Sequence, residues 1–208
     1  QVFVCYTNRT MFSDLNLTQL VIVFICIILS MAIHEAIHAF TSHWLGDTTA
    51  KEHGRLTLNP LKHIDVLTTV LLPMVLIVVG ATPFFIAKPV PFNPERVKYE
   101  EFGAALIGIA GPLSNLLLAV IGALIVRATG MAVGTDVFMI FSTFIAVNIG
   151  MFVFNMIPFP PLDGSRLLYA FAPEPLQKVM YQIESGGITS ILIFMFLLYP
   201  LFGDVIYN

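Results

Sequence analysis

The chain has 208 residues, of which 57% are hydrophobic and only 11% are charged, and its net charge is −3. Soluble domains carry about 25% charged residues, so this composition, with a mean hydropathy of +0.88, excludes an ordinary soluble protein and indicates an integral membrane protein. The acidic balance and the lack of a basic arm exclude a nucleic-acid partner from the expected functions, and leave the lipid bilayer as the expected surroundings.

The apolar character begins close to the N-terminus. We expect residues 1–14 to form an N-terminal extracytoplasmic leader, because they are mixed in character and lack the cationic start and small-residue cleavage site of a signal peptide. Residues 15–208 are expected to form a single membrane domain. About 20 residues are needed to cross a bilayer, so this length allows a handful of helices and no sizeable soluble domain.

Long apolar stretches alternate with shorter polar ones along this domain. Helices are predicted over four apolar stretches, residues 15–45, 102–127, 136–157 and 188–206. Gly46-Asp47 ends the first, and three prolines between Asn155 and Gly164 forbid regular helix there. The predicted fold class is an all-α polytopic membrane protein, a helical bundle of about four to six transmembrane segments.

Residues 66–87 are also apolar, and the distribution of basic residues bears on their path. Lys and Arg collect on the cytoplasmic side of short loops. If the first helix runs inward, only Arg9 and Arg127 lie outside, and the remaining basic residues lie inside: Lys51, Arg55, Lys62, Lys88, Arg96, Lys98, Arg166 and Lys178. Both ends of segment 66–87 are then cytoplasmic. We therefore expect a re-entrant or hairpin element bent at Pro73, Gly80 or Pro83, with a simple span as the alternative.

The first predicted helix carries His34-Glu35-Ala36-Ile37-His38 in its last third. Residues four apart lie on one helix face, so His34 and His38 can bind the same metal ion. Glu35 would lie beside that ion, where it can take a proton from bound water. The alternative is a structural pair of histidines hydrogen-bonded between helices. Three polar groups on an apolar helix are costly, which favours the metal site.

A catalytic zinc commonly has three protein ligands, so one more is needed. Nearby candidates are His43, close to the end of the first helix, and five residues of the polar stretch that follows: Asp47, Glu52, His53, His63 and Asp65. Asp163 is the better candidate, because the helix before it also runs inward and brings it to the same side of the membrane as the histidines. On its own, an aspartate before Gly164 is more typical of a turn.

Three motifs recur together in a known family. They are His34-Glu35-x-x-His38, Gly108-x-Ala110-Gly111-Pro112-x-x-Asn115, and Asn155-x-x-Pro158-x-Pro160-Pro161-Leu162-Asp163-Gly164. With these, residues 30–170 resemble the site-2 protease family of intramembrane zinc metalloproteases, in its short, minimal-core form. The resemblance implies one zinc ion bound by His34, His38 and Asp163, with Glu35 as general base and acid. It also implies cleavage of a peptide bond within or beside the transmembrane helix of a single-span substrate protein, at an active site toward the cytoplasmic side.

Other polar and small residues have more than one interpretation. The amides of Asn115 and Asn155 can hold a substrate strand or the developing oxyanion, or can only cap or stitch helices. Gly103, Gly108 and Gly111 are expected where helices pack closely. Two other function classes stay open. A membrane metal-ion transporter would show polar residues through several helices, and a non-proteolytic helix-binding relative would be expected to lose Glu35.

Overall fold

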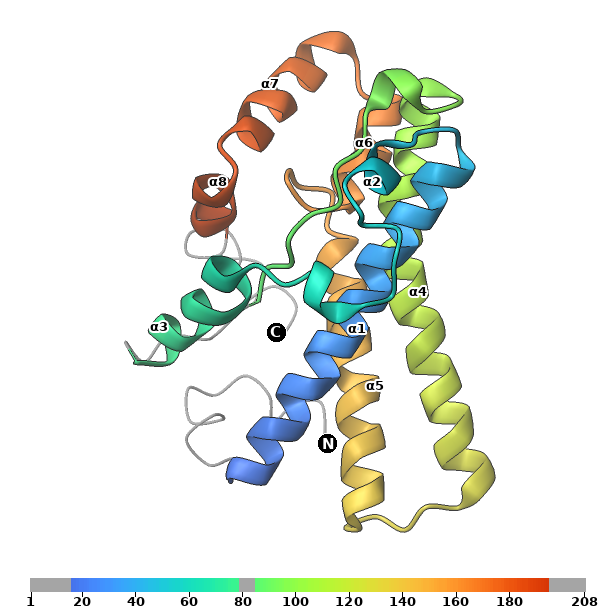
Figure 1. The fold of residues 1–208 in the computed structure, drawn as a ribbon, viewed down its shortest axis with the longest axis vertical. Coiled ribbons are helices and arrows are strands. Elements are labelled where there is room, and N and C mark those ends of the chain that lie inside the picture. Colours follow the sequence, from blue (N-terminus) through green and yellow to red (C-terminus); the bar gives the residue numbers. More distant parts are fainter. Residues whose placement is uncertain (1–15, 79–84, 195–208) are drawn as a thin grey trace.

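The computed structural model describes residues 16–78 and 85–194, and three long helices dominate it (Figure 1). They are α1 (Leu17–Trp44), α4 (Glu100–Thr129) and α5 (Asp136–Asn155), each long and apolar enough to cross a membrane. Shorter helices complete the described part: α2 (Thr49–Glu52), η2 (Pro60–Lys62), η3 (Val66–Leu71), α3 (Leu72–Val78), η4 (Pro94–Arg96), α6 (Gly164–Phe171), α7 (Glu174–Ser185) and α8 (Ile188–Ile193). No strand occurs in these residues, which confirms an all-α membrane fold.

The three long helices follow the predicted stretches closely. Asn16 starts α1 with a capping box, in which its side chain accepts from the Gln19 N–H and the Gln19 side chain accepts from the Asn16 N–H. Helix α1 packs against both α4 and α5. The predicted helix over 188–206 begins as α8, and its remainder, like the predicted leader 1–14, lies outside the described residues.

Small residues let α4 approach its neighbours. A Cβ on Gly108 would come within 2.6 Å of Arg166 Cβ, and one on Gly122 within 3.0 Å of Ile145 on α5. Gly111 faces α1, so the close packing predicted for Gly108 and Gly111 is confirmed. Gly103 differs, because a Cβ there would overlap the Lys98 carbonyl in the loop just before the helix.

Segment 66–87 returns to the place where it starts. The Ile86 carbonyl accepts from the hydroxyls of Thr68 at 3.1 Å and Thr69 at 2.7 Å, and the Lys88 N–H donates to the His63 carbonyl at 3.0 Å. A single span would place the two ends on opposite sides of the membrane, so these contacts agree with the predicted hairpin and exclude a straight crossing. Pro73 lies within α3, whereas Gly80 and Pro83 fall outside the described residues.

Helices α1 and α5 run in the same direction and α4 runs in the opposite direction (Figure 1). The chain between α1 and α4 and the chain after α5 therefore lie at the same end of the bundle. They carry all the basic residues from Lys51 to Lys98 together with Arg166 and Lys178, while Arg127 lies near the opposite end of α4. The predicted grouping of basic residues is thus present in the fold.

Candidate metal centre

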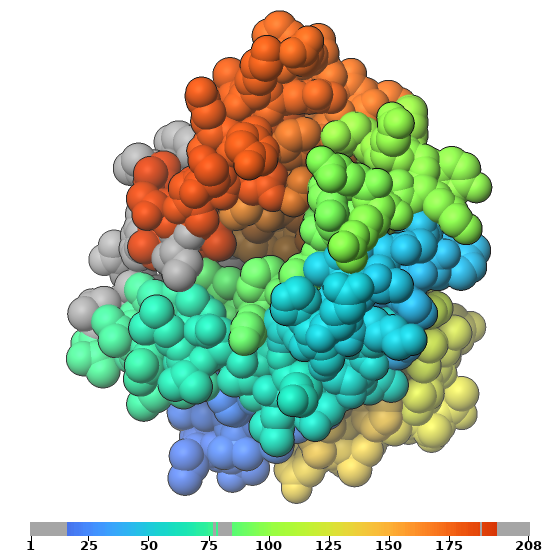
Figure 2. Space-filling model, turned by 45° about the horizontal axis from the view of Figure 1, so that its top comes forward, coloured from blue at the N-terminus to red at the C-terminus, as the bar shows by residue number. Residues whose placement is uncertain are grey.

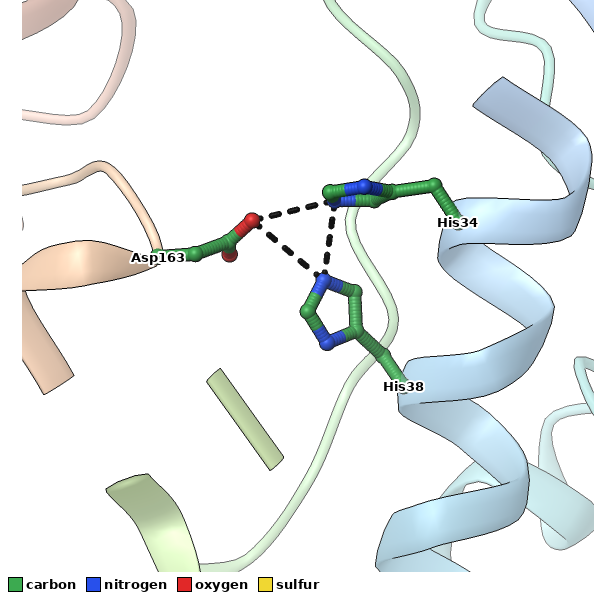
Figure 3. A group of neighbouring side chains, drawn as sticks. All are labelled: His34, His38 and Asp163. Carbon is green, nitrogen blue, oxygen red and sulfur yellow. Dashed lines mark hydrogen bonds and ion pairs between the residues drawn. The ribbon is translucent and has the colours of Figure 1, made fainter. Parts of the chain in front are cut away.

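Two histidines of α1 meet the aspartate that precedes α6 (Figure 3). His34 Nε2 lies 3.0 Å from Asp163 Oδ2, and His38 Nε2 lies 3.4 Å from the same oxygen. The two Nε2 atoms are 3.0 Å apart. These three side chains form a group of possible metal ligands, and no other such group of three occurs in the part of the chain that the structure describes.

The other nitrogen of each imidazole ring, Nδ1, is hydrogen-bonded to an acceptor on α4. His38 Nδ1 donates to the Ile107 carbonyl at 2.7 Å, and His34 Nδ1 donates to Asn115 Oδ1 at 2.6 Å. A carbonyl oxygen can only accept, so the proton of a neutral His38 ring lies on Nδ1. Both Nε2 atoms then direct lone pairs toward Asp163, which is the arrangement typical of metal-binding histidines.

The spacing of these atoms fits a zinc ion. Ligands at about 2.0–2.1 Å from a tetrahedral zinc lie about 3.3 Å from one another, and the separations here are 3.0, 3.0 and 3.4 Å. Two nitrogen lone pairs and a carboxylate at this distance repel each other unless a proton or a metal cation lies between them. The donor set is therefore chemically suited to a divalent metal, with a position left open for water.

Gly111 allows α4 to lie directly against the metal ligands. A Cβ at this position would overlap His38 Nε2 and come within 2.8 Å of His34 Cε1. Glycine is therefore required at position 111, since any larger residue would displace the imidazole rings.

Glu35 lies beside the metal ligands and is 9% exposed. Its Oε2 accepts a hydrogen bond from the Val90 N–H at 3.2 Å. Val90 belongs to residues 85–93, an extended segment that we call the strap. The strap therefore orients the carboxylate of the residue that the sequence predicts as general base.

Buried polar residues from the chain after α1 hold the strap in place. Arg55 Nη2 donates to the carbonyls of Lys88 at 2.7 Å and Pro89 at 3.1 Å, and the Asn93 N–H donates to Asp47 Oδ2 at 2.8 Å. Arg55 is only 5% exposed. Burial lowers the pKa of its guanidinium, and the negative charge of Glu35 opposes that shift. From the sequence, Arg55 is most simply a topology signal, and nothing in its local pattern indicates this contact.

Asp47 connects the end of α1, the start of α2 and the strap. Besides Asn93, its carboxylate accepts from the Ser42 hydroxyl and from the N–H and hydroxyl of Thr49. Burial alone would raise the pKa of Asp47, but these hydrogen bonds outweigh it and hold the pKa below its ordinary value. Asp47 was a candidate third ligand, and the structure instead uses it to join loops.

The two asparagines predicted at the site have different positions. Asn115 is fully buried, holds His34 through Oδ1, and donates from Nδ2 to Asn148 Oδ1 at 2.9 Å. Asn155 Nδ2 donates to the Met151 carbonyl of its own helix at 3.0 Å. Asn115 thus stitches helices, which is one of the two roles left open by the sequence, and it does so at a metal ligand.

Two further buried polar residues, Asn148 and Ser30, were not singled out from the sequence. The Asn148 side chain donates to the Ser30 hydroxyl and to the Phe144 carbonyl, each at 2.8 Å. No motif marks either residue. The only available signal is their polarity within strongly apolar helices, where such groups normally have a partner or a function.

The cluster opens toward the end of the molecule that carries the loops. The Asp163 side chain is 25% exposed, whereas those of His34 and His38 are 5% and 9% exposed. Figure 2 shows a hollow on this end, bordered by α7 and α8, the chain before α4, and α3, with the orange chain after α5 inside it. Water can therefore approach from the side of Asp163.

Several curated proteins are similar to this chain. It is 38% identical over 193 residues to "Putative zinc metalloprotease YwhC" of Bacillus subtilis (strain 168), covering 89% of this chain and 84% of that protein. It is 28% identical over 181 residues to "Putative zinc metalloprotease Rip2" of Mycolicibacterium smegmatis, covering 81% of this chain and 64% of Rip2. Rip2 of Mycobacterium tuberculosis (strain H37Rv) is 27% identical over 175 residues, which cover 80% of this chain and 63% of Rip2. No protein-family model and no solved structure matches the chain.

Proposed function

Because the chain belongs to the zinc metalloprotease family that includes YwhC, we propose that it is an intramembrane protease of the site-2 type. It would hydrolyse a peptide bond within or next to the transmembrane helix of a single-span membrane protein. The observation that carries this proposal is the meeting of two Nε2 atoms and one carboxylate oxygen, from residues 34, 38 and 163, at zinc-ligand spacing beside Glu35. These ligands come from helices that are themselves long and apolar enough to lie in the membrane, or directly follow one.

His34, His38 and Asp163 would hold one zinc ion. A bound zinc supplies a Lewis acid, which polarises the scissile carbonyl and lowers the pKa of water to about 7. Glu35 takes the proton of the attacking water on a carboxylate oxygen and later delivers it to the nitrogen of the leaving amine. The Val90 N–H holds one of the two carboxylate oxygens and so keeps the group facing the reaction.

The proposed substrate follows from the location of the site. All backbone hydrogen bonds of a transmembrane helix are satisfied internally, so its carbonyls are unavailable to a protease until the helix unwinds locally. Substrates are therefore expected to carry helix-weakening residues near the cleaved bond. Water and the unwound strand would meet at Asp163, the most exposed of the three proposed ligands.

The active site is proposed to face the cytoplasm. The site lies toward the end of the bundle where the loops carry most of the Lys and Arg residues, including Lys51, Arg55 and Lys62. Basic residues in short loops are retained on the cytoplasmic side. The leader and the short connection between α4 and α5 would then be extracytoplasmic.

The experiment combines metal analysis with cleavage of model single-span helices by the purified chain. Wild type and Glu35→Gln are both expected to contain one zinc per chain, and cleavage is expected to fall by about 10²–10⁴-fold in the variant. Glu52→Gln is the matched control, because Glu52 is an exposed carboxylate whose partner, Arg96, is also exposed. Unchanged cleavage in Glu35→Gln, or metal transport by that variant in liposomes, would contradict the protease assignment.

A further inference from the structure

We infer that Asn148 and Ser30 are positioning residues for the metal centre: they orient Asn115, which in turn fixes the ring and the tautomer of His34. The inference rests on the proposed function, because it concerns the readiness of His34 Nε2 to bind zinc. Asn148 on α5 and Ser30 on α1 lie on the side of His34 that faces away from Asp163, so they would contact neither the metal nor the substrate.

These side chains form one continuous row of hydrogen bonds through the three long helices. Asn148 Nδ2 on α5 donates to the Phe144 carbonyl and to Ser30 Oγ on α1, each at 2.8 Å. Asn115 Nδ2 on α4 donates to Asn148 Oδ1 at 2.9 Å, and His34 Nδ1 donates to Asn115 Oδ1 at 2.6 Å. The row therefore ends on the nitrogen of His34 that faces away from Asp163.

The direction of every bond in the row is set by one backbone carbonyl. The Phe144 oxygen can only accept, so the NH₂ group of Asn148 must face it and the Asn148 oxygen must face Asn115. Asn115 consequently offers its NH₂ group to Asn148 and its oxygen to His34. An acceptor at this position requires the His34 proton on Nδ1, which leaves the Nε2 lone pair free for a metal.

The burial of the row argues against an incidental contact. Asn115, Asn148 and Ser30 are all 0% exposed. In α5, which the structure describes throughout, Asn148 is the one buried residue, and the other residues of the helix, most of them apolar, are half-buried or exposed. Buried polar groups cost free energy unless they are hydrogen-bonded. A row of fully hydrogen-bonded side chains among apolar helices is therefore most simply explained by its role in holding His34, the metal ligand at its end.

Replacing Asn148 with leucine tests the row directly, because the two side chains are close in size. Asn115 Nδ2 would keep only two weak contacts, with the Ser30 carbonyl at 3.5 Å and with Met151 Sδ at 3.9 Å, and the amide could turn its NH₂ group toward His34. That orientation favours the tautomer protonated on Nε2, which cannot bind zinc. Loss of such outer hydrogen bonds typically weakens metal binding by about 10–100-fold.

Zinc affinity of the full chain, measured by chelator competition, is the first readout. Asn148→Leu is expected to weaken binding by about 10–100-fold, and Ser30→Ala by less, since the Phe144 carbonyl still holds Asn148. Ser142→Ala is the matched control on α5, because the Ser142 hydroxyl bonds only to the Met139 carbonyl of its own helix. It should bind zinc as wild type does.

The second readout is the histidine tautomer in the metal-free protein, measured by ¹⁵N NMR of histidine-labelled chain. His34 of the wild type should carry its proton on Nδ1, and Asn148→Leu should shift it toward Nε2. Finding the wild-type proton on Nε2 would overturn the inference even if the variant does not fold.

The outcomes separate this inference from the proposed function. If the wild type binds zinc and cleaves, while Asn148→Leu binds zinc equally tightly, the positioning role is wrong and the protease assignment stands. If the wild type binds zinc without cleaving, the protease assignment fails, and the tautomer and affinity measurements still decide the positioning role. A wild type that binds no zinc would overturn both.

Discussion

Gly111 shows how a single missing side chain shapes the metal centre. The residue lies on α4 against the His34 and His38 rings. A methyl group there must displace at least one ring, so Gly111→Ala is expected to reduce the zinc content of the purified chain and its cleavage activity together. Metal analysis of the variant checks this expectation.

Gly150 offers a matched control in another long helix. A Cβ added to Gly150 of α5 meets no atom of the described residues within 4 Å. Alanine is favoured over glycine in a helix by about 1 kcal/mol, so Gly150→Ala should keep full zinc content and melt no lower than wild type. Equal zinc contents in the two variants would show that α4 does not constrain the rings.

The metal ligands and their supporting residues differ in how readily a sequence reveals them. The positions of His34 and His38 follow from the geometry of one helix turn, which is local. Asp163 is found through its motif, since nothing local distinguishes it from a turn residue. Asn148 and Ser30 act only through side chains from other helices, and this information is absent from a single sequence.

Arg55 governs the strap, the element that reaches Glu35. Its guanidinium bonds to two successive carbonyls, which a lysine ammonium matches poorly. Arg55→Lys is therefore expected to lose about 1–3 kcal/mol of strap anchoring, to speed hydrogen exchange at Val90, and to lower cleavage while zinc content is unchanged. Arg96→Lys is the control, because Arg96 is exposed. Equal exchange at Val90 in both variants would show that Arg55 does not hold the strap.

Asp47 makes the attachment of the strap depend on pH. Its pKa is lowered in the folded chain, so its carboxylate contributes stability above the unfolded value of about 3.9 and loses that contribution as the pH falls through the folded pKa. Asp47→Asn should lower the unfolding midpoint at pH 7, since an amide has one oxygen and its NH₂ group would then face either the Asn93 N–H or the Thr49 N–H. The difference from wild type should shrink below about pH 4. A difference that is constant with pH would exclude ionised Asp47 as its source.

The elements differ in how far they could be predicted. The long helices were placed within about two residues because their apolar stretches are strong signals, as for 15–45 against the observed Leu17–Trp44. Helices α6 and α7 are short and lie in a stretch described only as polar, so they were missed. The path of the strap was also not predictable, because Arg55, His63 and Asp47 hold it through contacts between distant residues.

At the scale of the whole molecule, the fold predicts which ends share a side of the membrane. Single cysteines in place of Lys51 and Lys178 should react with an impermeant reagent from one side, and a cysteine in place of Gly134, between α4 and α5, from the other. The proposed orientation makes the first side cytoplasmic. The test uses a chain with Cys5 replaced by serine, while buried Cys26 serves as an unreactive background. Labelling of Lys51→Cys and Gly134→Cys from the same side would contradict a crossing of the membrane by α4.

The whole molecule also explains how ligands far apart in sequence meet. Because α1 and α5 run in parallel and α4 packs closely against both, the end of α5 brings Asp163 beside the histidines of α1. The fold therefore builds the site from the last third of α1 and the turn that joins α5 to α6. This is the claim on which the proposed hydrolysis depends.

X-ray absorption at the zinc edge of the purified chain tests that claim most directly. The predicted spectrum shows one zinc per chain with two imidazole nitrogens and carboxylate or water oxygens at about 2.0–2.2 Å, and Asp163→Asn should alter or empty the site. A sulfur shell at about 2.3 Å, a single imidazole, or a wild-type chain without zinc would contradict it.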